Sequence, residues 1–146
     1  MAHRIPIILC GKTVNIGAHV THLLKPEFEV IHFITSTEAA KAELADLLTG
    51  QAPKIPNTNN VGTNDYSKPP QAIVFGRGYL HTEIVELNKE HRGISSSPVA
   101  WIVGDPDVRA PAPLPPDYAV QAAHNVKRAF ERWKAAGGTS EIIVLY

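Results

Sequence analysis

The sequence is nearly devoid of cysteine and has no long hydrophobic run. Cys10 is the single cysteine among 146 residues, so no disulfide can form within the chain. Proteins that keep reduced thiols are typical of the cytosol, and we therefore expect a cytoplasmic protein. No apolar run approaches the length of a membrane-spanning helix, and the first residues lack the apolar segment of a secretory signal. These absences predict a protein that does not associate with a membrane.

An excess of either charge is also absent, because 14 Lys and Arg residues balance 14 Asp and Glu residues. Proteins that bind nucleic acids usually carry a basic surface, so we expect no nucleic-acid partner. His19 and His22 have the spacing of a helical metal pair, but no third ligand stands near them in the sequence. We expect no metal site.

Short apolar runs alternate with segments of helical periodicity along the whole chain. The predicted strands are residues 5–10, 29–34, 72–75, 99–103 and 142–146. Four predicted helices separate them, and the second begins with a capping box at Thr35 or Ser36. Right-handed crossovers between such units place helices on both faces of one sheet. The sequence therefore predicts a single α/β domain over residues 1–146, with three layers around a doubly wound, parallel, five-stranded sheet.

Two segments depart from this rhythm. Residues 51–70 form a loop that is too polar and too rich in proline for a regular element, and a loop of this length is usually a functional lid or a mobile excursion. The last helix carries an apolar face: Val120, Ala123, Val126, Phe130 and Trp133. The apolar strand that follows it lies at a sheet edge, where pairing with a second copy or packing of the Trp133 helix across a two-fold axis would cover it. A homodimer is therefore one hypothesis.

Polar residues cluster where the predicted strands end, and ligands of open α/β sheets bind outside these carboxyl ends. The candidate ligand-binding residues are Gly11, Lys12, Thr13, Asn15, Gly17, Ser36, Gly76, Arg77 and Tyr79. Lys12, Arg77 and Arg109 can converge there, beside the free N–H groups of the helix that begins near Asn15. This pattern predicts a pocket for an anionic ligand, although strand ends are also polar merely because water reaches them.

Three residues at the same ends are candidates for catalysis. Cys10 precedes Lys12, and a cation and a helix N-terminus both lower a thiol pKa. His81 follows the third strand and is placed to act as a general base, and Asp105 follows the fourth. The simpler interpretations are a buried strand cysteine, a polar residue at a helix N-terminus and a turn-forming aspartate.

The segment from Gly11 through Asn15 to Gly17, with the helix after it and Glu29-Val30 beyond, resembles the opening of NmrA-like and extended short-chain dehydrogenases. The resemblance covers about the first 35 residues and, weakly, the strand at 72–75. It implies a Rossmann-like domain. The cofactor stays open, with NADP and FMN as the candidates. If the third strand matches the family's fourth, the strand order is 2-1-3-4-5, as in flavodoxin, with the Rossmann order 3-2-1-4-5 as the alternative.

Three departures from that family shape the functional hypothesis. Val14 stands at the middle glycine, no acidic residue follows the second strand, and the catalytic Tyr-x-x-x-Lys is missing. We therefore expect a Rossmann-like domain that binds a nucleotide or another anionic metabolite without dehydrogenase activity. The alternatives are a small enzyme that uses Cys10, His81 or Asp105, and a homodimeric structural or interaction protein.

Overall fold

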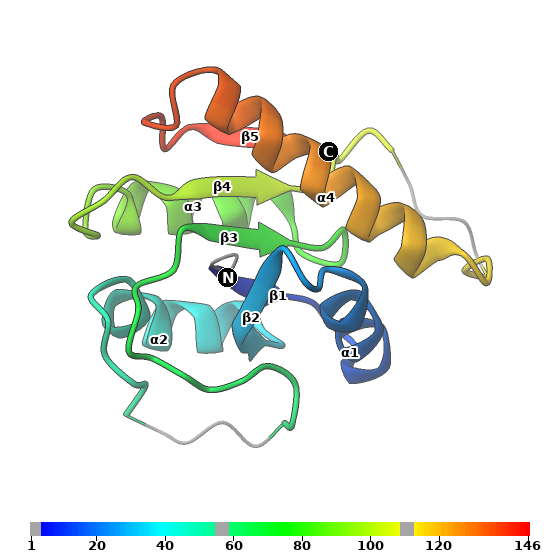
Figure 1. Ribbon diagram of the computed structural model, residues 1–146, viewed down its shortest axis with the longest axis horizontal. Helices are drawn as coiled ribbons and strands as arrows, with labels where there is room; N and C mark the ends of the chain where they lie inside the picture. The colour runs from blue at the N-terminus through cyan, green and yellow to red at the C-terminus, as the bar shows by residue number, and fades with distance from the viewer. Residues whose placement is uncertain (1–3, 55–58, 109–112) are drawn as a thin grey trace.

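The computed structural model describes residues 4–54, 59–108 and 113–146. Strands and helices alternate along the chain (Figure 1). The elements are β1 (Ile5–Cys10), α1 (Val14–Leu23), β2 (Phe28–Ile34), α2 (Thr37–Leu48), β3 (Ala72–Phe75), α3 (His81–His91), β4 (Ala100–Val103), α4 (Tyr118–Ala135) and β5 (Ile143–Leu145).

The five strands form one sheet in the order β2-β1-β3-β4-β5, and every neighbouring pair is parallel. This confirms the flavodoxin-like arrangement over the Rossmann order. The chain moves outward from β1 to β2 and then returns to the other side of β1 for β3. The order therefore reverses between β1 and β3, which is where a crevice opens in sheets of this kind.

Alternating side chains of β1 build two separate cores. Ile7 and Leu9 face the side of the sheet that α1 and α4 cover, whereas Ile8 and Cys10 face the side that α2 and α3 cover. Contacts between α1 and α4, and between α2 and α3, agree with these two helical layers (Figure 1). Burial on both faces explains why the inner strands are almost continuously apolar in sequence.

The helix boundaries largely follow the sequence signals, with one correction on the inner face of α4. Ser36 caps α2, because its Oγ accepts a hydrogen bond from the Ala39 N–H at 3.1 Å. Val120 was expected on the inner face of α4 but is 46% exposed. Trp133, expected on the same face, is buried there, and its Nε1 donates to the Ser140 carbonyl at 2.6 Å.

The described part of the 51–70 loop covers the outer edge of β2. The backbone N–H groups of Thr63 and Asn64 donate to the carbonyls of Val30 and Ile31, each at 2.9 Å, and Val61 joins the apolar core. None of residues 59–70 lines the pocket described below. In its described part, the loop is therefore an edge cover for the sheet, not a lid over the strand ends.

The opposite edge of the sheet belongs to β5. Ile142 is 70% exposed beside it, but the Leu145 carbonyl accepts a hydrogen bond from Arg132 Nη2 at 3.0 Å. This contact occupies the Leu145 carbonyl, which a second strand pairing with β5 would need as a hydrogen-bond acceptor. Within the three described ranges, no helix combines the length and apolar character needed to cross a membrane.

Candidate functional site

A pocket of about 530 Å³ opens at the carboxyl ends of β1, β3 and β4. It lies at the point where the strand order reverses, as the fold predicts. The turns after these three strands form one side of it, and the facing surfaces of α1 and α4 form the other. Its volume is in the range of about 300–1,000 Å³ that is usual for small-molecule sites.

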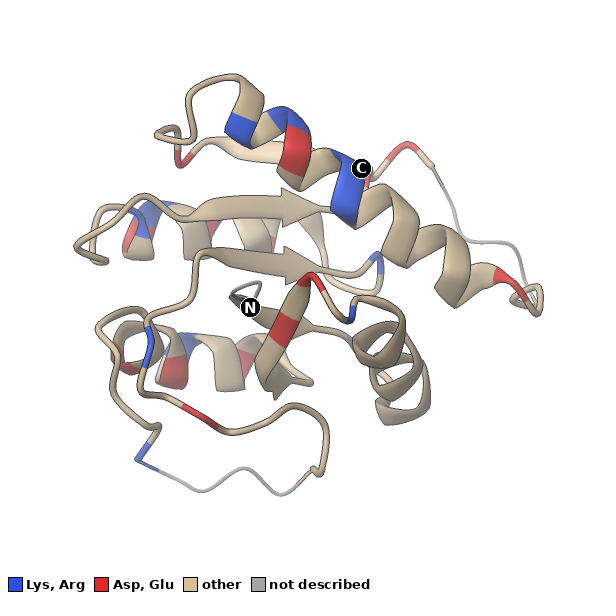
Figure 2. Cartoon of the chain, in the orientation of Figure 1, with Lys and Arg blue, Asp and Glu red and all other residues tan. Residues whose placement is uncertain are grey.

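The structure brings most of the predicted site residues to this pocket. Those that line it are Cys10, Gly11, Lys12, Thr13, Gly17, Gly76, Arg77, Tyr79, His81 and Asp105. Asn15 and Ser36 are not among the lining residues, and Ser36 caps α2 instead. Arg109 lies outside the described residues. Figure 2 shows Lys and Arg positions in the turns that follow β1 and β3.

Arg77 is held against the wall of the pocket. Its Nη2 donates to the Tyr146 carbonyl at 3.0 Å, and its guanidinium carbon lies 5.1 Å from the centre of the Tyr146 ring. A side chain at position 104 would come within 2.6 Å of Arg77 Cγ, so Gly104 leaves the space that the arginine occupies. The buried Nε of Arg77 has no hydrogen-bond partner in the described structure. The Nε–H of Arg77 is therefore buried without a partner, while its Nη2 is anchored.

Lys12 is exposed, and its Nζ lies 4.3 Å from the centre of the Tyr79 ring. The Tyr79 hydroxyl donates to the Ile34 carbonyl at 3.0 Å, which fixes the ring beneath the lysine. Burial raises the pKa of Tyr79 well above its usual range, so the phenol stays neutral. Of the two cations, Lys12 is the one whose ammonium group is free to move toward a ligand.

The three catalytic candidates all line the pocket, but two of them have structural roles there. Cys10 is fully buried, and this burial raises the pKa of its thiol far above the usual range, which disfavours a thiolate. His81 is the exposed first residue of α3. The Asp105 carboxylate accepts a hydrogen bond from the Asp107 N–H at 2.9 Å, as in a turn. The structure offers the simpler interpretation for Cys10 and Asp105.

The glycine turn after β1 does not fit a dinucleotide. In Rossmann domains these glycines let the backbone approach a pyrophosphate. Here a Cβ at position 17 would lie 2.4 Å from the Phe33 ring, and a Cβ at position 11 would lie 3.2 Å from it. The glycines therefore make room for Phe33, and β2 ends at Ile34 without a carboxylate for a ribose. For FMN, the turn at residues 11–13 supplies one hydroxyl side chain, that of Thr13, for a phosphate.

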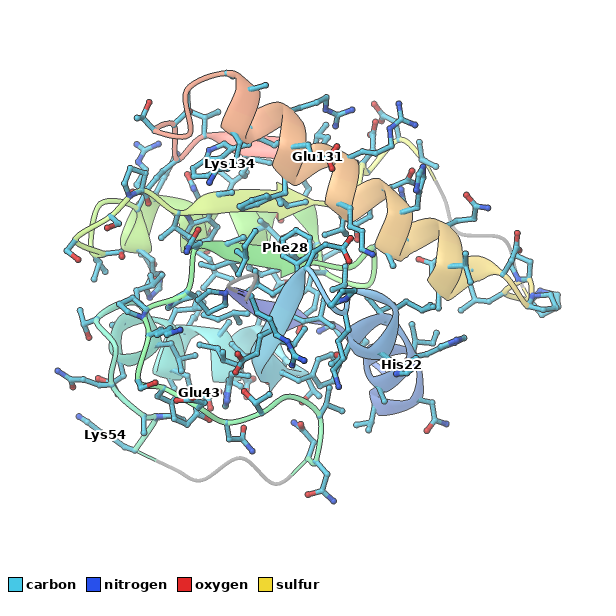
Figure 3. All side chains as sticks on the ribbon, in the orientation of Figure 1. His22, Phe28, Glu43, Lys54, Glu131 and Lys134 are labelled. Carbon is cyan, nitrogen blue, oxygen red and sulfur yellow. The ribbon has the colours of Figure 1, made fainter. Side chains whose placement is uncertain are left out.

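A second polar cluster, which the sequence did not reveal, lies under the 51–70 loop. His32 is 1% exposed, its Nε2 lies 3.1 Å from Glu43 Oε1, and its Nδ1 lies 2.8 Å from the Tyr66 hydroxyl. Burial lowers the pKa of His32, and the nearby Glu43 carboxylate only partly opposes this shift. Figure 3 labels Glu43 on α2, facing the loop that leads to β3. These residues come from three elements, so no short motif links them.

Metal ligands do not gather in the described ranges: no group of three or more His, Cys, Asp or Glu residues there is arranged to hold an ion. His19 and His22 are both exposed on α1.

The fold and pocket define a flavodoxin-like α/β domain with a site of small-molecule size at its strand ends. The chain is 34% identical over 136 residues to "Kojic acid related protein 6" of Aspergillus oryzae, a match that covers 92% of this chain and 80% of that protein. The chain therefore belongs to the family of that protein. No model of a known protein family matches the chain, and no solved structure matches it either.

Proposed function

We propose that this protein binds a small anionic metabolite in the pocket at the carboxyl ends of β1, β3 and β4. The observation that carries the proposal is the convergence of Lys12 and Arg77 on one cavity from turns that are distant in sequence. Asp105 is the acidic residue in the described lining, and its carboxylate is engaged by the Asp107 backbone. The two cationic side chains of the described lining outnumber this one carboxylate, which favours an anion.

The starts of two helices support the same proposal. Thr13, the N-cap of α1, and His81, the first residue of α3, both line the pocket. Helix N-termini carry a partial positive charge, and the first turn of α1 has no acidic residue to neutralise it. We propose binding without dehydrogenase activity, because the catalytic Tyr-x-x-x-Lys is missing and the glycine turn is filled by Phe33.

The cytoplasmic location, the homodimer and an enzymatic activity stay predictions. A cytoplasmic location agrees with the single, buried and unpaired Cys10. A homodimer through the β5 edge and an enzyme that uses His81 are further hypotheses, and the anchoring of Leu145 by Arg132 weighs against the first.

Thermal unfolding in the presence of ligands tests the proposal. The panel contains inorganic phosphate, acetate, AMP, NADP and FMN at millimolar concentrations, and kojic acid, because the name of the Aspergillus relative mentions it. An anion that binds the folded state at 100 times its Kd should add about 2.7 kcal/mol to the free energy of unfolding. Lys12→Gln should weaken the effect, whereas Lys41→Gln, an exposed control on α2, should not. If no anionic compound raises the melting temperature, the proposal is wrong.

A further inference from the structure

We infer that the ligand of this pocket is a small carboxylic acid with an apolar body, not a nucleotide. The inference rests on the proposed binding of an anion and specifies the chemistry of the rest of the ligand. It follows from three features of the pocket: its inner wall, its rim and the number of cations that can move.

The inner wall of the pocket is apolar. It is formed by the strand residues Leu9 and Val74, by Val20 of α1, and by Ala122 and Val126 of α4. All five are buried, with at most 8% of any side chain exposed. The hydroxyl groups of a ribose placed against this wall would lose hydrogen bonds to water without gaining protein partners, whereas a hydrocarbon chain or ring would gain from leaving water.

The rim of the pocket carries three apolar side chains beside its polar ones. Leu80, Val108 and Leu114 line the pocket and are 66%, 53% and 41% exposed. These three belong to the small set of large hydrophobic side chains that the described chain leaves exposed. Exposed apolar residues that gather around a cavity mark a binding surface, because a ligand that covers them removes their contact with water. A ligand without an apolar body would leave these three side chains in contact with water.

The cations fit a single negative charge better than a phosphate. Arg77 already donates to the Tyr146 carbonyl and lies over the Tyr146 ring, so its end group is anchored. Lys12 Nζ lies over the face of the Tyr79 ring, and its ammonium group can turn toward a ligand. One mobile ammonium at the mouth and an apolar interior match one carboxylate on an apolar body.

Pairs of acids and their amides test this inference by NMR titration of the ¹⁵N-labelled protein. The probes are phenylacetate with phenylacetamide, hexanoate with hexanamide, and AMP and inorganic phosphate as polar anions. We expect both acids to shift signals of the pocket residues and to bind about tenfold more tightly than their amides. Lys12→Gln should bring each acid close to its amide.

Two variants separate the apolar rim from general effects on the fold. Val108→Asn places a neutral polar group on the rim and should weaken binding of both acids about threefold. Val120→Asn, at a residue of α4 that is 46% exposed and outside the pocket lining, should leave binding unchanged.

The outcomes distinguish the inference from the proposal beneath it. If AMP or phosphate binds in a Lys12-dependent manner and more tightly than both acids, the inference is overturned and the proposed anion binding stands. If Val108→Asn binds the acids as well as the parent protein does, the apolar rim is not used and the inference is also overturned. If no acid, AMP or phosphate shifts any pocket signal, both the inference and the proposed function are wrong.

Discussion

Arg77 and Tyr146 contact each other at the wall of the pocket. Arg77 Nη2 donates to the Tyr146 carbonyl at 3.0 Å, and the Tyr146 hydroxyl donates to the Phe75 carbonyl at 3.1 Å. The two hydrogen bonds join the end of β3 to the residue after β5 across the intervening strand β4. Burial raises the pKa of Tyr146 to about 12, so its hydroxyl remains a donor throughout the neutral range.

We expect Arg77→Lys to lower the free energy of unfolding by about 1 kcal/mol, because an ammonium does not reproduce both the directed hydrogen bond and the flat contact with the Tyr146 ring. Urea denaturation measures the change. Arg128→Lys, an exposed position on α4, is the control. Equal stability of the two variants would show that the Arg77–Tyr146 contact contributes nothing.

The packing of Gly17 against Phe33 predicts a strongly coupled pair. Gly17→Ala should lower the free energy of unfolding by about 1–3 kcal/mol, because its Cβ would lie 2.4 Å from the Phe33 ring. Phe33→Leu alone should also destabilise, since it leaves part of a buried site empty. In the double variant, the added methyl group should lower the free energy of unfolding much less than it does in Gly17→Ala alone. Simple additivity in a urea-denaturation cycle would contradict this account.

The buried His32 predicts that stability depends on pH. Its pKa in the folded state is lower than the ordinary value of 6.5, so below pH 6.5 the unfolded chain binds more protons than the folded chain. The free energy of unfolding should therefore fall as the pH drops from 6.5 toward the lowered pKa of His32. His32→Gln should remove this part of the pH dependence, and His19→Gln, at an exposed site, should retain it. Parallel pH profiles for all three proteins would refute the prediction.

The hydrogen bonds of the loop to β2 predict protection from hydrogen exchange. The N–H groups of Thr63 and Asn64 should exchange slowly, because both donate to carbonyls of β2. Gly62 has φ of +88° and an added Cβ would lie 2.9 Å from the Val30 carbonyl oxygen, so Gly62→Ala should detach the loop and remove the protection. Thr63→Val, which loses the 2.6 Å hydrogen bond to Glu29 but keeps the backbone, should have a smaller effect. Fast exchange of these two N–H groups in the parent protein would contradict the conclusion that the loop covers the edge of β2.

The buried Cys10 predicts a thiol that does not react in the folded protein. Burial raises its pKa, so both access and thiolate character are low. A thiol reagent at pH 8 should label it only after denaturation in urea, with the denatured sample as the positive control. Rapid labelling of the folded protein would reopen the hypothesis of Cys10 as a nucleophile.

Local patterns in the sequence predicted most of the fold. The unbroken apolar runs predicted the inner strands, and the observed β1 and β3 match the predicted ranges. The carboxyl ends of parallel strands meet at one edge of the sheet, so the same reasoning placed Lys12 and Arg77 at a common pocket, where the structure has them. The predicted strand boundaries differ from the observed ones at the edge of the sheet, where β5 is three residues long and the prediction was five.

The errors concern partners that no local pattern specifies. Val120 and Ala119 both suit a helix, and which of them is buried depends on how α4 is rotated against the sheet. His32, Glu43 and Tyr66 were missed because three separate elements bring them together.

The sequence by itself determined that the chain is an α/β domain with a parallel sheet, because hydrophobic periodicity and turn residues act over a few neighbouring positions. Only the tertiary structure decided what the glycines and the cations contact. Gly17 faces the Phe33 ring, and Arg77 binds the Tyr146 carbonyl, and each pair is brought together from distant positions. The glycine pattern resembles that of a dinucleotide site, but long-range packing places the glycines against Phe33, beside a pocket with an apolar wall.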